Sequence, residues 1–326
     1  MTKGNIVKKY LYRFPSTPTK TLASKIYNEN KEVFKDVEDC RSIIKYYTGK
    51  KGKRELKKLL DKSFVKKEKA SHNPWDKFPE SYAETREPYK LAPGKWLILS
   101  DIHLPYHDTE AVKMALNYGL DNGYKNLLIN GDLIDFYQLS RYEKDPRKRS
   151  FKQELDSARL FIELVSEWFG SIVFKLGNHD ERYEKWMFVK APELLDCEDF
   201  RLDVLLRCGE HHVTVVGDKR IIQAGKLNIL HGHEFPGGSG GVNPARSMFL
   251  KACDSILVGH FHKTSSHTET TLQGDVITTH STGHLGESSP LYMPYNKWNH
   301  GFATLDLSTD GTYHLQNLRI VKGKIY

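Results

Sequence analysis

The chain has 326 residues, with 49 Lys and Arg against 41 Asp and Glu, which gives a formal net charge of +8. Its 39% hydrophobic and 28% charged residues are typical of a globular protein with enough core for one large domain or two unequal ones. No apolar run approaches the roughly 20 residues of a membrane span, and the first residues show no secretion signal. The four cysteines are scattered, which argues against a disulfide framework or a zinc ribbon. We therefore expect a cytoplasmic protein with no membrane partner.

The excess positive charge is concentrated at the start of the chain. Residues 1–70 contain 20 Lys and Arg and 8 Asp and Glu, a net charge of +12, whereas the remaining 256 residues have a net charge of −4. A concentrated basic module is typical of a protein that binds a polyanion, and nucleic acid, with DNA favoured, is the expected partner. The alternative is that these lysines only keep a small domain soluble.

Short helices are predicted within residues 16–62. Apolar residues recur at helical spacing from 22 to 27, and the stretch at 34–52 predicts a second helix, capped by Asp36 and ended by Gly49 or Gly52. Two short helices with a tight connection resemble a helix-turn-helix, although many small helical bundles share the pattern. The candidate nucleic-acid-binding residues of this module are Arg41, Lys45, Lys51, Lys53 and Arg54.

A proline-containing stretch of mixed charge at 71–94 predicts a linker, and residues 95–326 form the expected second domain. Five short apolar runs in this domain each end in polar residues, and helix-length segments such as 109–121 and 151–169 lie between them. This alternation predicts an α/β fold, in which functional residues gather at the carboxyl ends of the strands. The tail predicts a hairpin that turns at Asp310 and Gly311.

The polar ends of the five apolar runs form a series of short motifs. They are D-x-H at 101–103, G-D-x-x-D at 131–135, G-N-H-D at 177–180, H-G-H at 231–233 and G-H-x-H at 259–262. Each motif alone fits a turn or a cap, but five in succession predict one shared site. Carboxylates and imidazoles suit Mn, Fe, Zn or Ni, and a bridging carboxylate holds two ions about 3.5–4 Å apart.

In this order, the five motifs resemble those of the calcineurin-like metallophosphoesterase superfamily over residues 95 to about 265. The resemblance implies an α/β four-layer sandwich of two mixed β-sheets flanked by helices, here with a small N-terminal all-α domain, and two divalent metal ions, with manganese favoured and Fe, Zn or Ni possible. The N-terminal and C-terminal segments also resemble those of phage or prophage-encoded members of the family. The resemblance implies that one ion is held by Asp101, His103 and His262, the other by Asn178, His231 and His260, and that Asp132 bridges the two.

The resemblance also implies the catalytic roles. A hydroxide shared by the two ions is expected to attack the phosphorus in line, with His179 as the general acid. Asp180 is expected to fix the tautomer of His179, or alternatively to serve as the N-terminal carboxylate of the following helix. Asp135 is expected to orient a metal-binding histidine or a backbone group.

Three further residues are candidates for substrate binding. Arg246 lies in a glycine-rich segment at 235–252 that either cradles a phosphate at a helix start or forms a surface loop. Arg182 follows the third motif, and the insertion at 136–150, rich in Arg and Tyr, either rims the site or is a solvated loop. His233 is expected at the rim, because the first histidine of H-G-H is the expected ligand.

These observations predict a metal-dependent phosphoric ester hydrolase, with a phosphodiesterase or nuclease favoured over a phosphatase. One alternative is a phosphomonoesterase or small-nucleotide hydrolase whose N-terminal module serves assembly. An alternative of another class is a non-catalytic DNA-binding protein on a phosphoesterase scaffold. The complete set of ligand residues argues against the last, because an inactive site is expected to have lost ligands.

Overall fold

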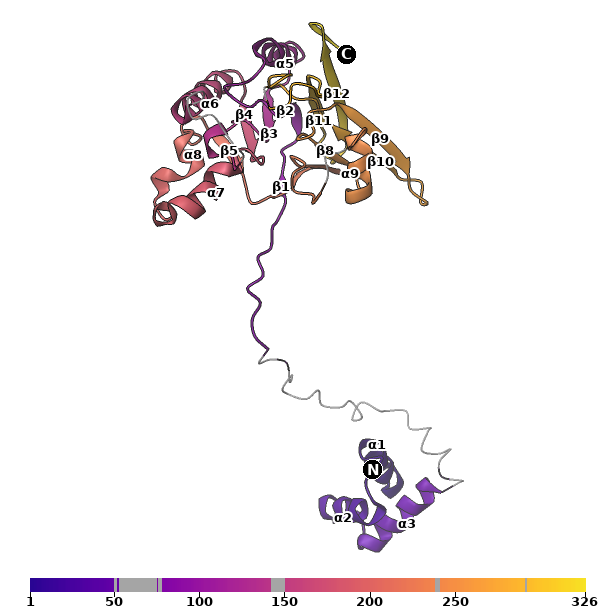
Figure 1. Ribbon diagram of the computed structural model, residues 1–326. Helices are drawn as coiled ribbons and strands as arrows, with labels where there is room; N and C mark the ends of the chain where they lie inside the picture. Colours follow the sequence, from indigo (N-terminus) through magenta and orange to yellow (C-terminus); the bar gives the residue numbers. More distant parts are fainter. Residues whose placement is uncertain (50–51, 53–74, 76–77, 142–149, 238–240, 291) are drawn as a thin grey trace. The chain divides into compact units, whose positions relative to one another are not determined.

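The computed structural model describes residues 1–49, 52, 75, 78–141, 150–237, 241–290 and 292–326. The chain divides into two compact units, Met1–Ala83 and Glu84–Tyr326 (Figure 1). Each unit has its own apolar core, and each is described by itself.

The N-terminal unit contains three helices, which are α1 (Lys3–Arg13), α2 (Thr19–Glu29) and α3 (Val37–Thr48). The predicted cap is confirmed, because the Asp36 carboxylate accepts a hydrogen bond from the backbone N–H of Asp39 at 2.8 Å, and α3 ends at Gly49. Helix α1 was not predicted. Its buried face of Ile6, Val7 and Leu11 completes a core that α2 and α3 share.

The second unit is built on two mixed sheets. The seven-stranded sheet has the order β13-β12-β11-β2-β3-β4-β5, and β2 to β5 are parallel. Its strands are β2 (Gly94–Leu99), β3 (Asn126–Asn130), β4 (Ser171–Lys175), β5 (Val213–Val216), β11 (Gly301–Leu307), β12 (Tyr313–Val321) and β13 (Lys324–Ile325). The six-stranded sheet has the order β1-β6-β7-β8-β10-β9, and its strands are β1 (Tyr89–Lys90), β6 (Ile222–Ala224), β7 (Leu227–Ile229), β8 (Ile256–Val258), β9 (Ser265–Thr270) and β10 (Val276–Ser281).

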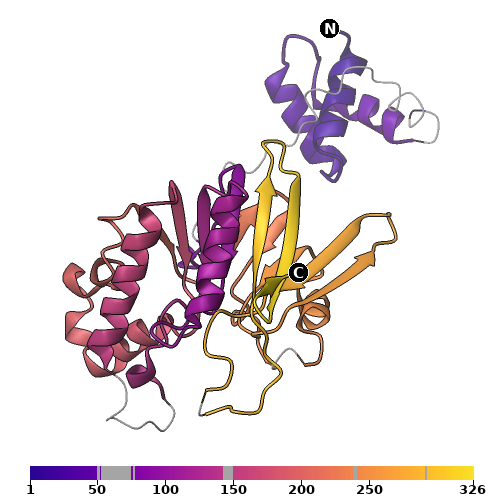
Figure 2. The ribbon, with the colours of Figure 1, turned by 90° about the horizontal axis from the view of Figure 1, so that it is seen from above.

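Helices cover the outer faces of the two sheets (Figure 2). The α-helices of this unit are α5 (Thr109–Asp121), α6 (Phe151–Ser166), α7 (Glu181–Lys190), α8 (Leu202–Leu205) and α9 (Pro244–Ala252). Short 3₁₀ turns lie at η2 (Tyr137–Leu139), η3 (Pro192–Leu194) and η4 (Glu198–Phe200).

The layers follow from the alternation of side chains along the strands. In β2, Leu97 and Leu99 belong to the core that the sheet shares with α5 and α6, whereas Trp96 and Ile98 belong to the core between the two sheets. Met248 of α9 packs in a separate cluster on the outer face of the six-stranded sheet. The predicted four-layer α/β sandwich is therefore confirmed.

Two details of the sequence interpretation are settled at the edges of this unit. Residues 89–91 fall in the expected linker at 71–94, yet β1 pairs with β6 and Leu91 is buried in the core between the sheets. The remaining domain bounds stay a prediction, since much of 50–77 lies outside the described residues. The C-terminal hairpin is confirmed by the antiparallel pairing of β11 with β12.

Among the helices of the described ranges, none has the length and apolar composition that crossing a membrane requires.

Candidate metal centre

The five motifs lie together because the strands that precede them end at one edge of the sandwich. Strands β2, β3 and β4 are parallel neighbours in one sheet, and β7 and β8 are parallel neighbours in the other. The carboxyl ends of neighbouring parallel strands meet at the same edge, so residues far apart in sequence converge there.

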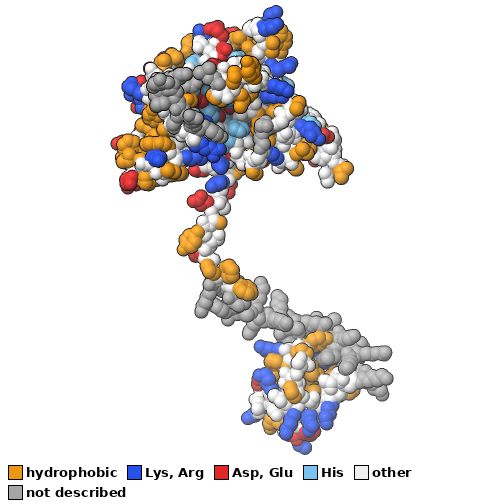
Figure 3. All heavy atoms as spheres, viewed as in Figure 1, with side chains coloured by type: hydrophobic (Ala, Val, Ile, Leu, Met, Phe, Trp, Pro, Cys, Tyr) orange, Lys and Arg blue, Asp and Glu red, His pale blue; other side chains and the backbone are white. Residues whose placement is uncertain are grey.

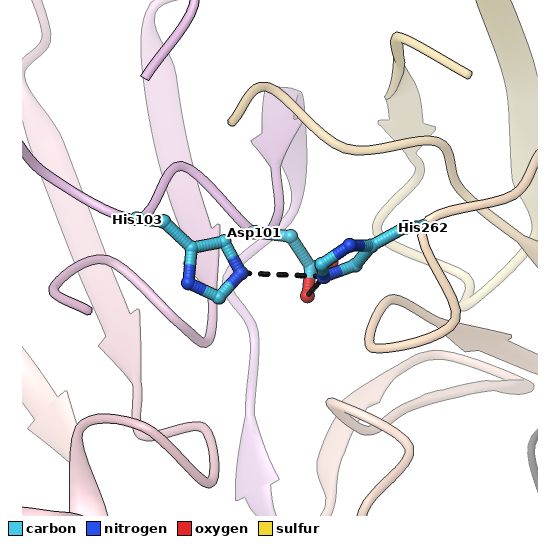
Figure 4. Close-up of side chains that lie close together, drawn as sticks. All are labelled: Asp101, His103 and His262. Carbon is cyan, nitrogen blue, oxygen red and sulfur yellow. Dashed lines mark hydrogen bonds and ion pairs between the residues drawn. The ribbon is translucent and has the colours of Figure 1, made fainter. Parts of the chain in front are cut away.

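The first ligand group consists of Asp101, His103 and His262 (Figure 4). The Nε2 atoms of His103 and His262 lie 3.2 Å apart, and Nε2 of His262 lies 3.2 Å from Oδ1 of Asp101. All three residues are buried. Two imidazole nitrogens and a carboxylate that face one another at such distances form a donor set suited to one divalent transition-metal ion.

The second ligand group consists of Asp132, His231 and His260, whose potential donor atoms lie within 4.8 Å of one another. Nδ1 of His231 lies 2.8 Å from the backbone oxygen of Asn130, which fixes the ring so that Nε2 faces Asp132 at 3.3 Å. That Nε2 atom is buried and makes no hydrogen bond within the described residues. A ring held by its outer nitrogen is the usual arrangement of a metal-binding histidine.

Two further atoms fit a site for two ions. Oδ2 of Asp132 lies near donors of both groups, 3.3 Å from Nε2 of His231 and 3.9 Å from Nε2 of His103, as expected of the bridging residue. Oδ1 of Asn178 is buried and has no hydrogen-bond partner in the described part of the chain. A ligand bond to a metal ion would satisfy it. The residues present therefore fit two divalent ions.

The ligand loops have an uncommon backbone conformation. Asp101, His103, Asp132, His260 and His262 all have positive φ, between 54° and 63°, a region that residues other than glycine seldom adopt. Strand β8 ends before the G-H-x-H motif, so both of its histidines lie on a turn. Such strain persists only where the surrounding structure imposes it, and it clusters at functional sites.

His179 lies beside the two ligand groups, with its Nε2 3.9 Å from Oδ2 of Asp132. Its Nδ1 faces Asp135, 3.0 Å from the backbone oxygen and 3.1 Å from Oδ1, so Nδ1 carries the proton. Nη2 of Arg182 donates to Nε2 of His179 at 3.0 Å. Burial alone lowers the pKa of His179, but the charge of Asp132 and the hydrogen bond to Asp135 outweigh it and raise the pKa.

Asp135 contacts a second histidine as well. Its Oδ1 lies 3.3 Å from Nδ1 of His103, so one carboxylate orients both His103 and His179. This proximity supports the expectation that Asp135 orients a metal-binding histidine, which stays a prediction. Burial disfavours its charged form, yet the two histidines hold the pKa of Asp135 well below its usual range.

The first of the two expected roles of Asp180, to fix the tautomer of His179, requires a correction. Its carboxylate is fully buried and accepts hydrogen bonds from the backbone N–H groups of Asp132, Gly177 and Ile134, at 2.7, 2.8 and 3.2 Å. It therefore holds two ligand loops together, while Asp135 is the carboxylate that fixes the tautomer of His179. Asp180 is also the N-cap residue of α7, as the alternative expected, although its side chain makes no cap hydrogen bond. Burial and the nearby charge of Asp132 raise the pKa of Asp180 to about 7.

The remaining candidate residues are placed as follows. His233 is outside both ligand groups, and its Nε2 lies 3.2 Å from Oε1 of Glu181. Arg246 is exposed in the first turn of α9, where Asn243 caps the helix as predicted, and within the described residues it has no hydrogen bond or ion pair with the ligand groups. The loop before it lies partly outside the described residues, so its proposed phosphate-binding role stays a prediction.

The candidate nucleic-acid residues are only partly described. Lys45 is exposed on α3, and Arg41 pairs with Glu38 at 3.3 Å on the same helix. Lys51, Lys53 and Arg54 lie outside the described residues, as does 142–149 of the basic insertion.

Sequence reasoning missed a buried ion pair under the ligand loops. Nζ of Lys175 lies 2.8 Å from Oε1 of Glu234. Glu234 also accepts hydrogen bonds from the backbone N–H groups of His231 and Gly232, at 3.2 and 2.7 Å. A lysine within the apolar run at 171–176 was the available signal, because a fully buried lysine needs a partner.

Two adjacent Asp and His ligand groups, with the Asp132 carboxylate near donors of both, are set at the carboxyl ends of strands in a two-sheet sandwich and define a metallophosphoesterase site. The chain matches the family model described as calcineurin-like phosphoesterase over residues 94–264, which is more than half of its length. The protein belongs to the calcineurin-like phosphoesterase family.

Several proteins are similar to the chain. The gene 54 protein of Mycobacterium phage L5 is 27% identical over 210 residues, which cover 60% of this chain and 75% of the phage protein. Zinc-complexed Vps29 from Entamoeba histolytica is 13% identical, with a TM-score of 0.39, and the match covers 71% of this chain and 96% of that one. Yfce, a phosphoesterase from E. coli, is 17% identical, with a TM-score of 0.34 and coverage of 68% and 98%. Likenesses this distant say nothing about the substrate.

Proposed function

We propose that the protein is a metal-dependent phosphodiesterase that hydrolyses phosphodiester bonds in nucleic acid, with DNA the favoured substrate. The observation that carries the proposal is the pair of ligand groups with Asp132 near donors of both, with His179 beside them and a basic module in the same chain. When bound, two divalent ions, with manganese favoured, supply the nucleophile and the positive charge that phosphoryl transfer requires.

The residues around His179 suit proton transfer to a leaving group. Asp135 holds the ring through Nδ1, so Nε2 is the nitrogen that faces the reacting atoms. In the structure this nitrogen accepts a hydrogen bond from Arg182. To act as a general acid, Nε2 must gain a proton, and Arg182 must then turn its donor to an oxygen of the substrate. Arg182 thus has a second proposed role, as a partner for the phosphate.

The substrate class is tested with a diester and a monoester. With Mn²⁺, we expect bis(p-nitrophenyl) phosphate to be hydrolysed faster than p-nitrophenyl phosphate, and a plasmid or oligonucleotide to be cut. Replacement His179→Asn should lower the kcat for the diester by about 10²–10⁴-fold, whereas His314→Asn on the exposed face of β12 is the matched control. Turnover of the monoester alone would support the phosphomonoesterase alternative.

The basic N-terminal unit supports nucleic acid as the substrate in a different way. It holds the whole excess of positive charge, and neutralising phosphates with Lys and Arg makes binding strongly dependent on salt. We propose that α3 contacts DNA through Arg41 and Lys45. The double replacement Arg41→Gln and Lys45→Gln in the full chain should weaken DNA binding and flatten its salt dependence. Unchanged binding and salt dependence would instead assign the unit to assembly.

A further inference from the structure

A basic pocket opens beside the metal centre along helix α7. Its volume is about 570 Å³, and its lining includes Asn178, Arg182, Lys185, Trp186 and Lys190. We propose that this pocket, called here the α7 groove, binds the single-stranded nucleotide next to the scissile phosphate, stacks its base on Trp186 and holds its phosphates with the cations. This inference rests on the proposed function.

The α7 groove is continuous with the metal centre. Asn178, a predicted metal ligand, belongs to its lining, and Arg182, which also lines it, contacts His179. Arg182 and Trp186 are four residues apart, so they lie one above the other on the same side of α7. Lys190 is four residues further on, about 12 Å along the helix from Arg182. A strand whose scissile phosphate lies at the metal centre can therefore extend along this side of α7.

The charge of the groove selects a polyanion. Among the described residues, the charged members of its lining are all cations, and they include Arg141 at the end of the described part of the insertion. Lys185 pairs with Glu181, whereas Lys190 is exposed and has no ionic partner within the described residues. Figure 3 shows Lys and Arg side chains beside the histidines of a hollow on this face of the molecule.

The cavity on the other side of α7 has a lining of mainly negative charge. This cavity of about 520 Å³ is lined by apolar side chains, by five carboxylates and by one cation, Arg201. These carboxylates are Asp180, Glu181, Glu184, Asp203 and Asp218, and Asp203 pairs with Arg201 at 2.8 Å. A polyanion is repelled from that cavity and attracted to the groove, so the two sides of one helix differ in the ligand that they accept.

Trp186 gives the groove a surface for a base. Its side chain remains 39% exposed, next to Val189, which is 73% exposed. An exposed indole flanked by cations is the arrangement on which bases of a single strand stack, without preference for sequence. A base inside a duplex is covered by its neighbours, so the groove favours single-stranded segments or frayed ends.

The test compares two substrates of equal length and charge. One is a single-stranded 12-mer deoxyoligonucleotide, and the other is the same 12-mer with abasic tetrahydrofuran residues around the cleaved position. With Mn²⁺, we expect the wild type to prefer the base-bearing strand by about tenfold in kcat/KM, as expected for one stacked base. Trp186→Ala should bring this preference close to one, and Trp186→Phe should retain most of it.

Two control variants separate stacking from charge and from general damage. Trp168→Ala, at a tryptophan that is 65% exposed outside the groove, should keep the preference. Lys190→Gln should weaken the binding of both strands alike. It should also reduce by about one the slope of the logarithm of the binding constant against the logarithm of the salt concentration. Lys113→Gln on α5 is its control, because that lysine is also exposed and lies outside the groove.

The possible outcomes distinguish the two proposals. If the wild type cuts both strands equally, or if Trp186→Ala keeps the preference, the α7 groove does not bind the base and the nuclease proposal stands. If the wild type hydrolyses bis(p-nitrophenyl) phosphate but cuts neither strand, the nucleic-acid substrate fails, and the inference about the groove fails with it.

Discussion

Lys175 and Glu234 join the two sheets directly beneath the metal centre. Nζ of Lys175, at the end of β4, lies 2.8 Å from Oε1 of Glu234, which follows β7 in the other sheet. The lysine side chain is 0% exposed, and Nζ also donates to the backbone oxygen of Arg220 at 2.8 Å. Because Glu234 accepts from the N–H of the ligand His231, the pair positions one ligand loop against the opposite sheet.

Replacement Lys175→Met should therefore destabilise the protein strongly. It leaves the carboxylate of Glu234 buried without its cation, and breaking a buried pair in this way costs about 3–5 kcal/mol of unfolding free energy. Lys113→Met is the matched control, since Lys113 forms an exposed pair with Glu110 and such pairs contribute about 0–1 kcal/mol. Urea denaturation measures both. Equal midpoints for the two variants would contradict the role given to the buried pair.

The same pair predicts a pH dependence of stability. Burial raises the pKa of Glu234, but Lys175 and the neighbouring histidines outweigh it and lower the pKa to about 2, against an ordinary value of 4.5. A carboxyl whose pKa is depressed on folding stabilises the fold above its unfolded pKa, and this contribution disappears as the pH falls from 4.5 towards 2.

The unfolding free energy of the wild type, measured in EDTA, should therefore fall across this range, and part of the fall belongs to Glu234. Lys175→Met should show a shallower decrease, because its Glu234 no longer has the cation that lowers its pKa. A parallel decrease in the two proteins would mean that Lys175 does not set the pKa of Glu234.

Much of the centre could be predicted from sequence, because its ligands are local to strand ends. Asp101, His103, Asp132, His231 and His260 each belong to a short motif after an apolar run, and each lies in a ligand group. The strand pattern also predicts the sheets, since alternation along β2 decides which residues face the helices and which face the other sheet.

Other features depend on tertiary contacts that no local pattern records. Asp180 follows His179 directly, and adjacency favoured a contact between them, yet the turn directs the carboxylate to the N–H groups of another loop. Asp135, 44 residues earlier, faces His179 instead. In the same way, Glu234 forms an ion pair with Lys175 of the opposite sheet, which is far from it in the sequence.

Asp135 should act as a positioning residue for metal binding as well as for turnover. Asp135→Asn keeps the size of the side chain but removes the charge that orients His103 and His179. Loss of such an outer partner typically lowers metal affinity or activity by about 10–100-fold. Calorimetric titration with Mn²⁺ reports the affinity, and kcat on a diester reports the effect through His179.

Asp275→Asn, in the exposed turn between β9 and β10, is the control and should change neither quantity. If Asp135→Asn binds Mn²⁺ with wild-type affinity but loses kcat, then Asp135 orients His179 alone, and its contact with His103 contributes nothing to binding.

Gly259 should tolerate no side chain, because the G-H-x-H turn passes directly over Asp101. A Cβ atom at Gly259 would lie 2.6 Å from Oδ2 of Asp101 and 2.7 Å from Oγ of Ser100, both buried groups with no room to withdraw. Relief of the clash must move the His260 backbone, whose N–H now donates to Oδ2 of Asp101 at 2.9 Å. Gly259→Ala should thus weaken Mn²⁺ binding at least about tenfold, on the scale of losing a ligand's supporting contact.

Gly209→Ala, where a Cβ meets nothing within 4 Å, is the matched control for calorimetry. Wild-type affinity in Gly259→Ala would show that the turn can shift without disturbing the ligands, contrary to the strained and closely packed backbone described for it.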